Sequence, residues 1–347
     1  MPSPAEDKER ALMALALRRV VERGWLSALL GYLAKKDEVR VRLKYIGDVR
    51  LQRDELGALA MSTYYATKCW PELPDELARA ASRFPKPQEA FLWLVTGLSL
   101  ASYACRLQAS GNRVSIDVSP ERVGLEVNGV PAVFNTHCVD VVTINETFAE
   151  GGYEVPEVLS GLRGRDVIDV GANVGDTALY FVLNGARKVI AVEPLPSVVK
   201  CADENVRLSG AADKVKVLNA ALSYEPVSVP CDYDVRLSGS FFTLDSSGPC
   251  EVPGVTLGDL LNMVEDPYLL KMDCEGCEAQ VILGPERERL RAFEHIIFET
   301  HPLNTGVSNE KLLASLKELG FECRPLRRSS KLSQSKYHCK NIRPKVT

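Results

Sequence analysis

The sequence lacks two features that would assign it to a class at once: an excess of charge of one sign and a long uncharged hydrophobic run. Its 347 residues carry 42 Lys and Arg against 46 Asp and Glu, for a formal net charge of −4. This balance excludes a uniformly basic nucleic-acid-binding protein. The longest uncharged stretch, residues 90–105, is shorter than the roughly 20 residues that a membrane helix needs. It predicts a buried helix and no membrane span.

A secretory signal is not visible either, because residues 1–10 are polar and the Ala- and Leu-containing segment after them includes Arg18, Arg19 and Glu22. The 10 cysteines are scattered along the whole chain. Without a secretory signal we expect them to be free thiols, and we expect a cytoplasmic protein. The composition, 46% hydrophobic and 25% charged, is typical of globular proteins. At ~150 residues per domain, the length favours about two domains.

Residues 1–110 predict a mainly helical region, in which apolar residues recur at helical spacing from Leu12 to Leu33. A short basic strand is expected over 39–51, a helix over 55–67, a proline-rich break over 71–87 and the buried helix over 89–107. Residues 111–145 predict a short β segment, with Asn128-Gly129 as a hairpin turn. Residues 1–110 carry no assignable motif, and binding of an acceptor or a partner is their expected role.

From Asp166 onward, strand and helix patterns alternate. Strands are expected over 166–170, 188–192, 215–218, 268–272, 295–298 and 320–324, with helices between them. This alternation predicts an α/β fold with a doubly wound, mostly parallel sheet. Ligands of such sheets bind outside the carboxyl ends of the strands, so the residues that end each strand are the candidates for function.

The first of these strands ends in Asp169-Val-Gly171-Ala-Asn173-Val-Gly175-Asp176-Thr177, and the second ends in Glu193. Glycine lets the backbone turn sharply and approach a ligand, and a carboxylate at Glu193 can accept hydrogen bonds from both hydroxyls of a ribose. The G-x-G-x-x-G pattern of dinucleotide-binding proteins is absent, since Asn173 stands at its middle glycine. S-adenosylmethionine, which has no phosphate, suits the loop better. The alternative is that the glycines only shape a turn.

Several segments together resemble the FkbM-type methyltransferases: 169–177, Glu193-Pro194, 219–223, 256–260 and 270–278. The family's signature K-x-D-x-E-G-x-E is matched by Lys271, Asp273, Glu275, Gly276 and Glu278. The resemblance implies a class I, Rossmann-like methyltransferase domain over 146–347, with a C-terminal antiparallel hairpin and S-adenosyl-L-methionine as its cofactor. Members of this family are mostly O-methyltransferases.

The resemblance also implies the site residues. The cofactor would be bound by Glu150, Asp169, Gly171, Ala172, Asn173, Gly175, Asp176, Thr177, Glu193, Pro194, Asn219, Ala220 and Asp273. The candidates for catalysis are Asp273, Glu275, Glu299 and His301. Glu146, Glu150 and Tyr153 would share one face if their segment is helical.

Methyl transfer to an alcohol needs positioning and removal of the hydroxyl proton. By its ordinary pKa, His301 is the best base among the candidates, although a lone histidine is often structural. Asp273 and Glu275 could share a divalent cation, or one of them could orient the loop. We expect no required metal.

Cys274 and Cys277 form a CxxC, which can be a redox pair or half of a zinc site. No second CxxC is present to complete such a site, and we interpret the two as small apolar residues packing a turn. Residues 324–347 hold 8 Lys or Arg and no acid. We interpret this tail as a final hairpin of strands 324–327 and 337–342, the alternative being an RNA-binding patch.

The sequence therefore predicts S-adenosylmethionine-dependent O-methylation of a small molecule, sugar or glycolipid by in-line transfer. One alternative is an RNA methyltransferase that uses the basic C-terminal edge. The other is a non-catalytic, cofactor-binding interaction module.

Overall fold

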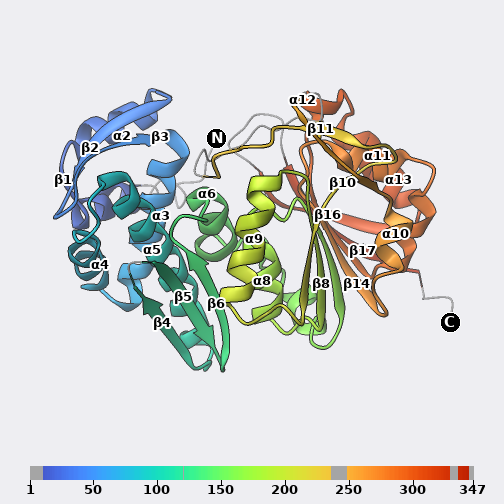
Figure 1. Ribbon diagram of the computed structural model, residues 1–347, viewed down its shortest axis with the longest axis horizontal. Coiled ribbons are helices and arrows are strands. Elements are labelled where there is room, and N and C mark those ends of the chain that lie inside the picture. Colours follow the sequence, from blue (N-terminus) through green and yellow to red (C-terminus); the bar gives the residue numbers. More distant parts are fainter. Residues whose placement is uncertain (1–10, 120, 236–247, 329–334, 344–347) are drawn as a thin grey trace. The chain divides into compact units, whose positions relative to one another are not determined.

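The computed structural model describes residues 11–119, 121–235, 248–328 and 335–343 and divides the chain into two compact units (Figure 1). The first unit extends to Gly151, and the second begins at Gly152. The β segment expected over 111–145 therefore belongs to the same unit as the N-terminal helices.

The first unit combines helices with two three-stranded antiparallel sheets. Its helices are η1 (Leu17–Arg19), α2 (Trp25–Leu33), α3 (Arg53–Cys69), α4 (Leu73–Ala81), α5 (Pro87–Ala109), α6 (Val141–Ile144) and η2 (Asn145–Ala149). Its strands are β1 (Val21–Arg23), β2 (Glu38–Leu43), β3 (Gly47–Gln52), β4 (Val114–Val118), β5 (Arg122–Val127) and β6 (Val130–Asn135).

Helix α5 is the buried helix that the uncharged stretch predicts. It is long and apolar enough to cross a membrane, but 89% of its apolar window is buried inside the structure. Every residue from Ala90 to Cys105 is buried. The apolar character of α5 is thus used to form the core of the first unit.

Two local expectations in this unit are wrong. The single strand over 39–51 is a hairpin, because the chain reverses at Tyr45, where φ is +63°, and β2 pairs with β3. The proline-rich break contains α4, which tolerates Pro74 because the N–H groups of a first helical turn have no partner within the helix. The condition for Glu146, Glu150 and Tyr153 to share one face is not met, because the segment is helical only to Ala149 and Tyr153 already belongs to the second unit.

The second unit contains the sheet and the helices that alternate with its strands. The helices are α7 (Pro156–Gly161), α8 (Asp176–Leu183), α9 (Pro196–Leu208), α10 (Leu257–Leu261), α11 (Cys277–Leu283), η3 (Arg287–Ala292), α12 (Pro302–Thr305) and α13 (Asn309–Glu318). The strands are β7 (Asp166–Val170), β8 (Lys188–Glu193), β9 (Val215–Asn219), β10 (Ala221–Leu222), β11 (Val227–Val229), β12 (Cys250–Val252), β13 (Gly254–Val255), β14 (Pro267–Met272), β15 (His295–Glu299), β16 (Phe321–Arg328) and β17 (Ser335–Asn341).

Seven of these strands form one sheet in the order β16-β17-β15-β14-β7-β8-β9. All pairs are parallel except those of β17, which is antiparallel to both β15 and β16. The predicted doubly wound, mostly parallel sheet and its C-terminal hairpin are both confirmed. Residues 329–334 and 344–347 of the basic tail lie outside the described residues.

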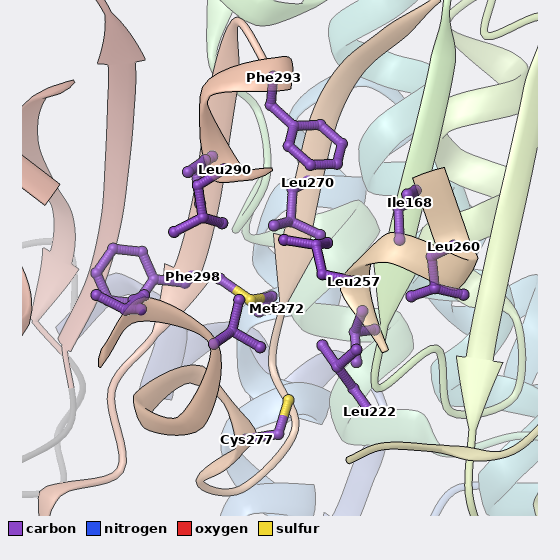
Figure 2. Packing of buried hydrophobic residues seen from close by; sticks show 14 of the residues in the cluster. Ile168, Leu222, Leu257, Leu260, Leu270, Met272, Cys277, Leu290, Phe293 and Phe298 are labelled. Carbon is purple, nitrogen blue, oxygen red and sulfur yellow. The ribbon is translucent and has the colours of Figure 1, made fainter. Parts of the chain in front are cut away.

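Helices cover both faces of this sheet. Figure 1 shows α8 and α9 on one side and α10, α11 and α13 on the other. The second side holds a continuous hydrophobic cluster to which Ile168, Leu270 and Phe298 contribute from three neighbouring strands (Figure 2). Because the parallel strands are buried on both faces, their sequences are almost entirely apolar until the residue that ends each strand.

The expectation of free thiols is wrong, because all ten cysteines are disulfide-bonded. Within the first unit, Cys69 at the end of α3 is bonded to Cys105 of α5. The second unit contains the bonds Cys231–Cys250, Cys274–Cys277 and Cys323–Cys339. Packing of helices and pairing of strands bring most of these residues together, which their spacing in the sequence does not reveal. Cys274 and Cys277, interpreted as small residues packing a turn, are bonded to each other, and Cys277 also packs in the hydrophobic cluster.

Candidate functional site

The loop after β7 is shaped by two glycines with positive φ, and at the first of them a side chain would not fit. Gly171 has φ of +74°, and a Cβ added there would lie 1.8 Å from the backbone oxygen of Asp273. Gly175, with φ of +83°, packs against Ala202 of α9 and precedes α8. Backbone is therefore brought close to the end of the neighbouring strand β14, and the loop continues directly into a helix.

Asp169, which lies in β7 and is fully buried, anchors this loop from inside. Its Oδ2 accepts a hydrogen bond of 2.6 Å from Thr177 Oγ1, and its Oδ1 lies 3.1 Å from Lys271 Nζ. Lys271 also donates to the backbone oxygen of Gly171 at 2.6 Å. A buried charge is tolerated when it is paired and hydrogen-bonded. The pair thus ties the glycine loop to β14.

Glu193 ends β8 beside the same loop. Its Oε2 accepts the backbone N–H of Asn173 at 3.1 Å, and its Oε1 accepts that of Leu195 at 3.0 Å. Burial raises the pKa of the Glu193 carboxyl to about 7, against the opposing effect of these two hydrogen bonds. An ionised carboxylate has about four acceptor positions, so further donors can still be bound.

Asn219 holds the end of β9 next to Glu193. Its Nδ2 donates to the backbone oxygens of Glu193 at 3.2 Å and Pro194 at 2.8 Å. The backbone N–H of Ala220 also donates to the Glu193 oxygen, at 3.2 Å. The strand-end residues of β8 and β9 expected at a cofactor site are therefore adjacent.

Asp273, directly after β14, is held by groups that favour its ionised form. Tyr153 donates a hydrogen bond of 3.0 Å from its hydroxyl to Asp273 Oδ2. Burial opposes ionisation, but the charges of Lys336, Lys271 and His301 and the Tyr153 hydrogen bond outweigh it. They hold the pKa of Asp273 below its usual value.

Two lysines lie near the Tyr153 ring and bring positive charge close to Asp273. Lys336 Nζ of β17 lies 3.9 Å from the ring centroid, and Lys271 Nζ lies 5.6 Å from it. Lys336 is 4% exposed and pairs with Glu299 Oε2 at 3.7 Å. Glu299, at the end of β15, is thereby connected to Asp273 through Lys336 and Tyr153.

His301 is buried among three carboxylates. Its Nδ1 lies 2.9 Å from Glu278 Oε1, and its Nε2 lies 3.4 Å from Glu275 Oε2 and 3.7 Å from Asp273 Oδ1. Burial lowers the pKa of His301, but the hydrogen bond to Glu278 and the three negative charges raise it to about 9. The ring is therefore an imidazolium at neutral pH, with both nitrogens available as donors.

All four predicted catalytic candidates thus lie at the carboxyl ends of β14 and β15, and two of them, Asp273 and Glu275, surround the imidazole of a third, His301. Four residues outside that set join them: Lys271, Glu278, Tyr153 and Lys336. The first two belong to the K-x-D-x-E-G-x-E signature and could have been included from it. Nothing in the sequence indicates that Lys336 belongs to the site, because it is one of several basic residues in the tail. Its burial, which only the structure shows, distinguishes it.

The remaining predicted cofactor residues follow the same strand ends. Ala172 donates its N–H to the Val192 oxygen at 3.1 Å, and Asp176 is buried at the start of α8. Glu150 belongs to the first unit, where its Oε1 accepts a 3.0 Å hydrogen bond from Asn145. Its contact with a cofactor stays a prediction. Among the described residues, no group of three or more His, Cys, Asp or Glu side chains could hold a metal ion.

Residues 169–323 match the family described as "Methyltransferase FkbM domain". The methyltransferase sdnD of Sordaria araneosa is 24% identical over 212 residues, which are 51% of this chain and 80% of that protein. Among solved structures, precorrin-6y C5,15-methyltransferase from Geobacter metallireducens is similar at 12% identity, covering 53% of this chain and 87% of its own, with a TM-score of 0.32. An O-methyltransferase from Bacillus cereus is similar at 13% identity, 55% and 79% coverage and a TM-score of 0.34. At such scores the fold class rests on the observed strand order and the family match.

Proposed function

Because residues 169–323 form an FkbM methyltransferase domain of class I architecture, we propose that the protein transfers a methyl group from S-adenosylmethionine to a hydroxyl oxygen of a small molecule, sugar or glycolipid head group. Methyltransferase activity follows from the domain. The cofactor and the acceptor class are the proposal, and the oxygen acceptor rests on the family resemblance.

The residues at the strand ends fit S-adenosylmethionine. The Gly171 loop offers backbone where a side chain is excluded, and it lies beside Glu193, whose two oxygens each accept one N–H. A carboxylate with acceptor positions to spare can bind both ribose hydroxyls. Asn219 and Ala220 follow Glu193 at the next strand end, where an adenine ring would lie.

The bound cofactor would supply a methyl group already activated by a positive sulfonium, so the protein's contribution is positioning and proton removal. Asp273 is the group best suited to receive the acceptor hydroxyl, because its carboxylate is kept ionised and its backbone oxygen adjoins the glycine loop. It accepts the hydroxyl hydrogen bond and takes the proton as the new carbon–oxygen bond forms. Tyr153 fixes its orientation through Oδ2.

His301 serves this arrangement as a fixed positive charge. As an imidazolium it lies between Asp273, Glu275 and Glu278, and so lowers the mutual repulsion of three carboxylates in one region. Lys336 does the same for Asp273 and Glu299. Proton acceptance is thus assigned to Asp273 and charge balance to His301 and Lys336.

A small acceptor is favoured over RNA because two lysines of the C-terminal hairpin are already paired with carboxylates. Lys336 is buried against Glu299, and Lys340 pairs with Glu157. Basic side chains that are already paired are less available to neutralise phosphates, which supply most of the affinity for nucleic acids.

The observation that carries the proposal is the position of Asp273, whose backbone oxygen adjoins Gly171 and whose carboxylate is held by Tyr153. Labelled S-adenosylmethionine should transfer its methyl group into the small-molecule or lipid fraction of an extract, and Asp273→Asn should lower the rate at least about 100-fold with the cofactor Kd unchanged. Mass spectrometry of the product distinguishes an O-methyl from an N-methyl group. Calorimetry with Asp169→Ala and Glu193→Ala checks the cofactor site, and unchanged affinity in both would refute it.

A further inference from the structure

The loop between β14 and α11 is closed by a disulfide that spans two residues with positive φ. Cys274 and Cys277 are bonded, with their Cα atoms 5.5 Å apart, and they enclose Glu275 and Gly276. Both enclosed residues have positive φ, +55° at Glu275 and +130° at Gly276. Glycine adopts such angles freely, but a glutamate does so only at a cost in conformational energy. Glu275 therefore needs contacts that keep it in place.

Two kinds of contact supply this constraint. The side chain of Asn304, on α12, donates to the backbone oxygen of Glu275 at 3.2 Å and to its Oε2 at 3.0 Å. The disulfide fixes the distance between the residues on either side. A cross-link over so short a loop restricts the few conformations that the loop can adopt.

The same loop sets the surroundings of His301. Glu275 Oε2 lies 3.4 Å from His301 Nε2 on one side of the ring. On the other side, Glu278 Oε1 lies 2.9 Å from His301 Nδ1 and also accepts the backbone N–H of Cys274 at 3.2 Å. Glu275 thus lies between the two cysteines, and Glu278 directly follows Cys277. These two carboxylates contact the two nitrogens of the His301 ring. Asp273 directly precedes Cys274.

We propose that the Cys274–Cys277 disulfide is a redox-sensitive clamp that positions Glu275 and Glu278 around His301, so that reduction of this bond lowers methyl transfer without weakening cofactor binding. The inference rests on the proposed function for its effect on catalysis. Its effect on His301 does not depend on that function.

Access to the bond is asymmetric. Cys277 is 2% exposed and packs in the hydrophobic cluster, where Figure 2 shows it near Leu222 and Met272. Cys274 is only partly buried. A thiolate of a small dithiol therefore attacks Cys274 Sγ, and Cys277 leaves as a thiolate that takes up a proton. The second thiol of the reductant then displaces Cys274, so the disulfide gains two electrons and two protons while the reductant becomes a disulfide.

The test compares two double variants that each remove one disulfide from the second unit. Cys274→Ala/Cys277→Ala removes the clamp, and Cys323→Ala/Cys339→Ala removes the bond between β16 and β17 as a matched control. For each we measure the pKa of His301 by NMR, with His301→Asn for assignment, the cofactor Kd by calorimetry, and kcat and KM for methyl transfer. His301 is faced by Glu278 from α11 and by Asp273 and Glu275 from the clamped loop, so release of the loop displaces carboxylates that raise its pKa.

Loss of the clamp should lower the pKa of His301 by about one unit and kcat by about tenfold, with the cofactor Kd changed by less than about twofold. The control should change none of these. If the clamp variant does not fold, the wild-type protein is titrated with dithiothreitol, alkylation and mass spectrometry identify the reduced bond, and the same quantities are measured. An unchanged His301 pKa and kcat after loss of this bond would overturn the proposal. If no form of the protein transfers methyl, the proposed function fails, while the His301 titration still decides the clamp.

Discussion

Gly171 and Asp273 lie so close that only a hydrogen atom fits between the Gly171 α-carbon and the Asp273 carbonyl. A Cβ at position 171 would be 1.8 Å from that oxygen. The contact connects the glycine loop after β7 to the catalytic candidate after β14, residues about a hundred positions apart in the chain. It holds the expected cofactor and acceptor sides of the site in one rigid arrangement.

Gly171→Ala should therefore damage both stability and cofactor binding. The backbone at positive φ and the collision with Asp273 together should lower the free energy of unfolding by roughly 3 kcal/mol or more, as measured by urea denaturation. Gly210→Ala is the control, because Gly210 has φ of +59° with nothing within 4 Å of the added Cβ. It should cost only about 1 kcal/mol. Equal losses in both variants would contradict the role of the close contact.

Cofactor affinity should depend on pH through Glu193. Its pKa of about 7 means that the carboxyl is partly protonated in the free protein near neutral pH. Ribose hydroxyls donate best to the ionised form, so binding should release protons and weaken as the pH falls from 8 to 6. Calorimetry in buffers of different ionisation enthalpy measures this. Glu193→Gln should bind more weakly and lose the pH dependence, whereas Glu322→Gln, on the exposed side of β16, should retain it.

Tyr153→Phe should alter the acceptor side alone. Removing the hydroxyl removes a hydrogen bond that lowers the pKa of Asp273, so the acidic limb of the kcat–pH profile should move to higher pH. We expect kcat to fall about tenfold, as for the loss of one charge-assisted hydrogen bond, with the cofactor Kd unchanged. Tyr337→Phe, at a tyrosine of β17 that stacks on Phe298, is the matched control and should leave the profile in place. A profile identical in all three proteins would refute the positioning role.

The buried pair His295 and His338 should make the protein sensitive to acid. His295 Nδ1 lies 2.9 Å from His338 Nε2. Burial, and to a lesser extent the positive charge of His295, lowers the pKa of His338 to about 4. The unfolded chain binds a proton near pH 6.5, before the folded protein does, so the free energy of unfolding should decrease as the pH falls from 6.5 towards 4. The loss from His338 should be about 2 kcal/mol. His338→Gln should flatten this part of the stability curve, and His137→Asn, at an exposed position in the first unit, should not.

The cysteine pairing is directly measurable. Alkylation of the unfolded protein before reduction should label no cysteine, and after reduction all ten. A peptide map without reduction should contain Cys231 linked to Cys250 and Cys323 linked to Cys339. Any cysteine labelled before reduction would contradict full pairing. The cytoplasmic location stays a prediction, and paired cysteines there are characteristic of hyperthermophiles, since most cytoplasms keep thiols reduced.

Much of the sheet could be predicted because each of its parallel strands is an apolar run ended by a polar residue. The strands over 166–170, 188–193 and 267–272 lie within one residue of their expected positions. The hairpin β2–β3 could not be predicted, because its two strands and its turn together have the pattern of one alternating basic strand. Only the pairing of β2 with β3 shows where the chain reverses.

The sequence by itself determined the fold of the second unit and which strand ends carry its polar residues, because hydrophobic periodicity and glycine position depend on local geometry. It also carried the resemblance to the FkbM methyltransferases, through the K-x-D-x-E-G-x-E signature and the loop over 169–177, and residues 169–323 match that family's domain. Only the tertiary structure decided which residues surround Asp273 and His301, and which cysteines are bonded. Tyr153 and Lys336 approach Asp273 from positions far apart in the chain, and the charge and pKa of a buried group depend on such neighbours rather than on sequence order.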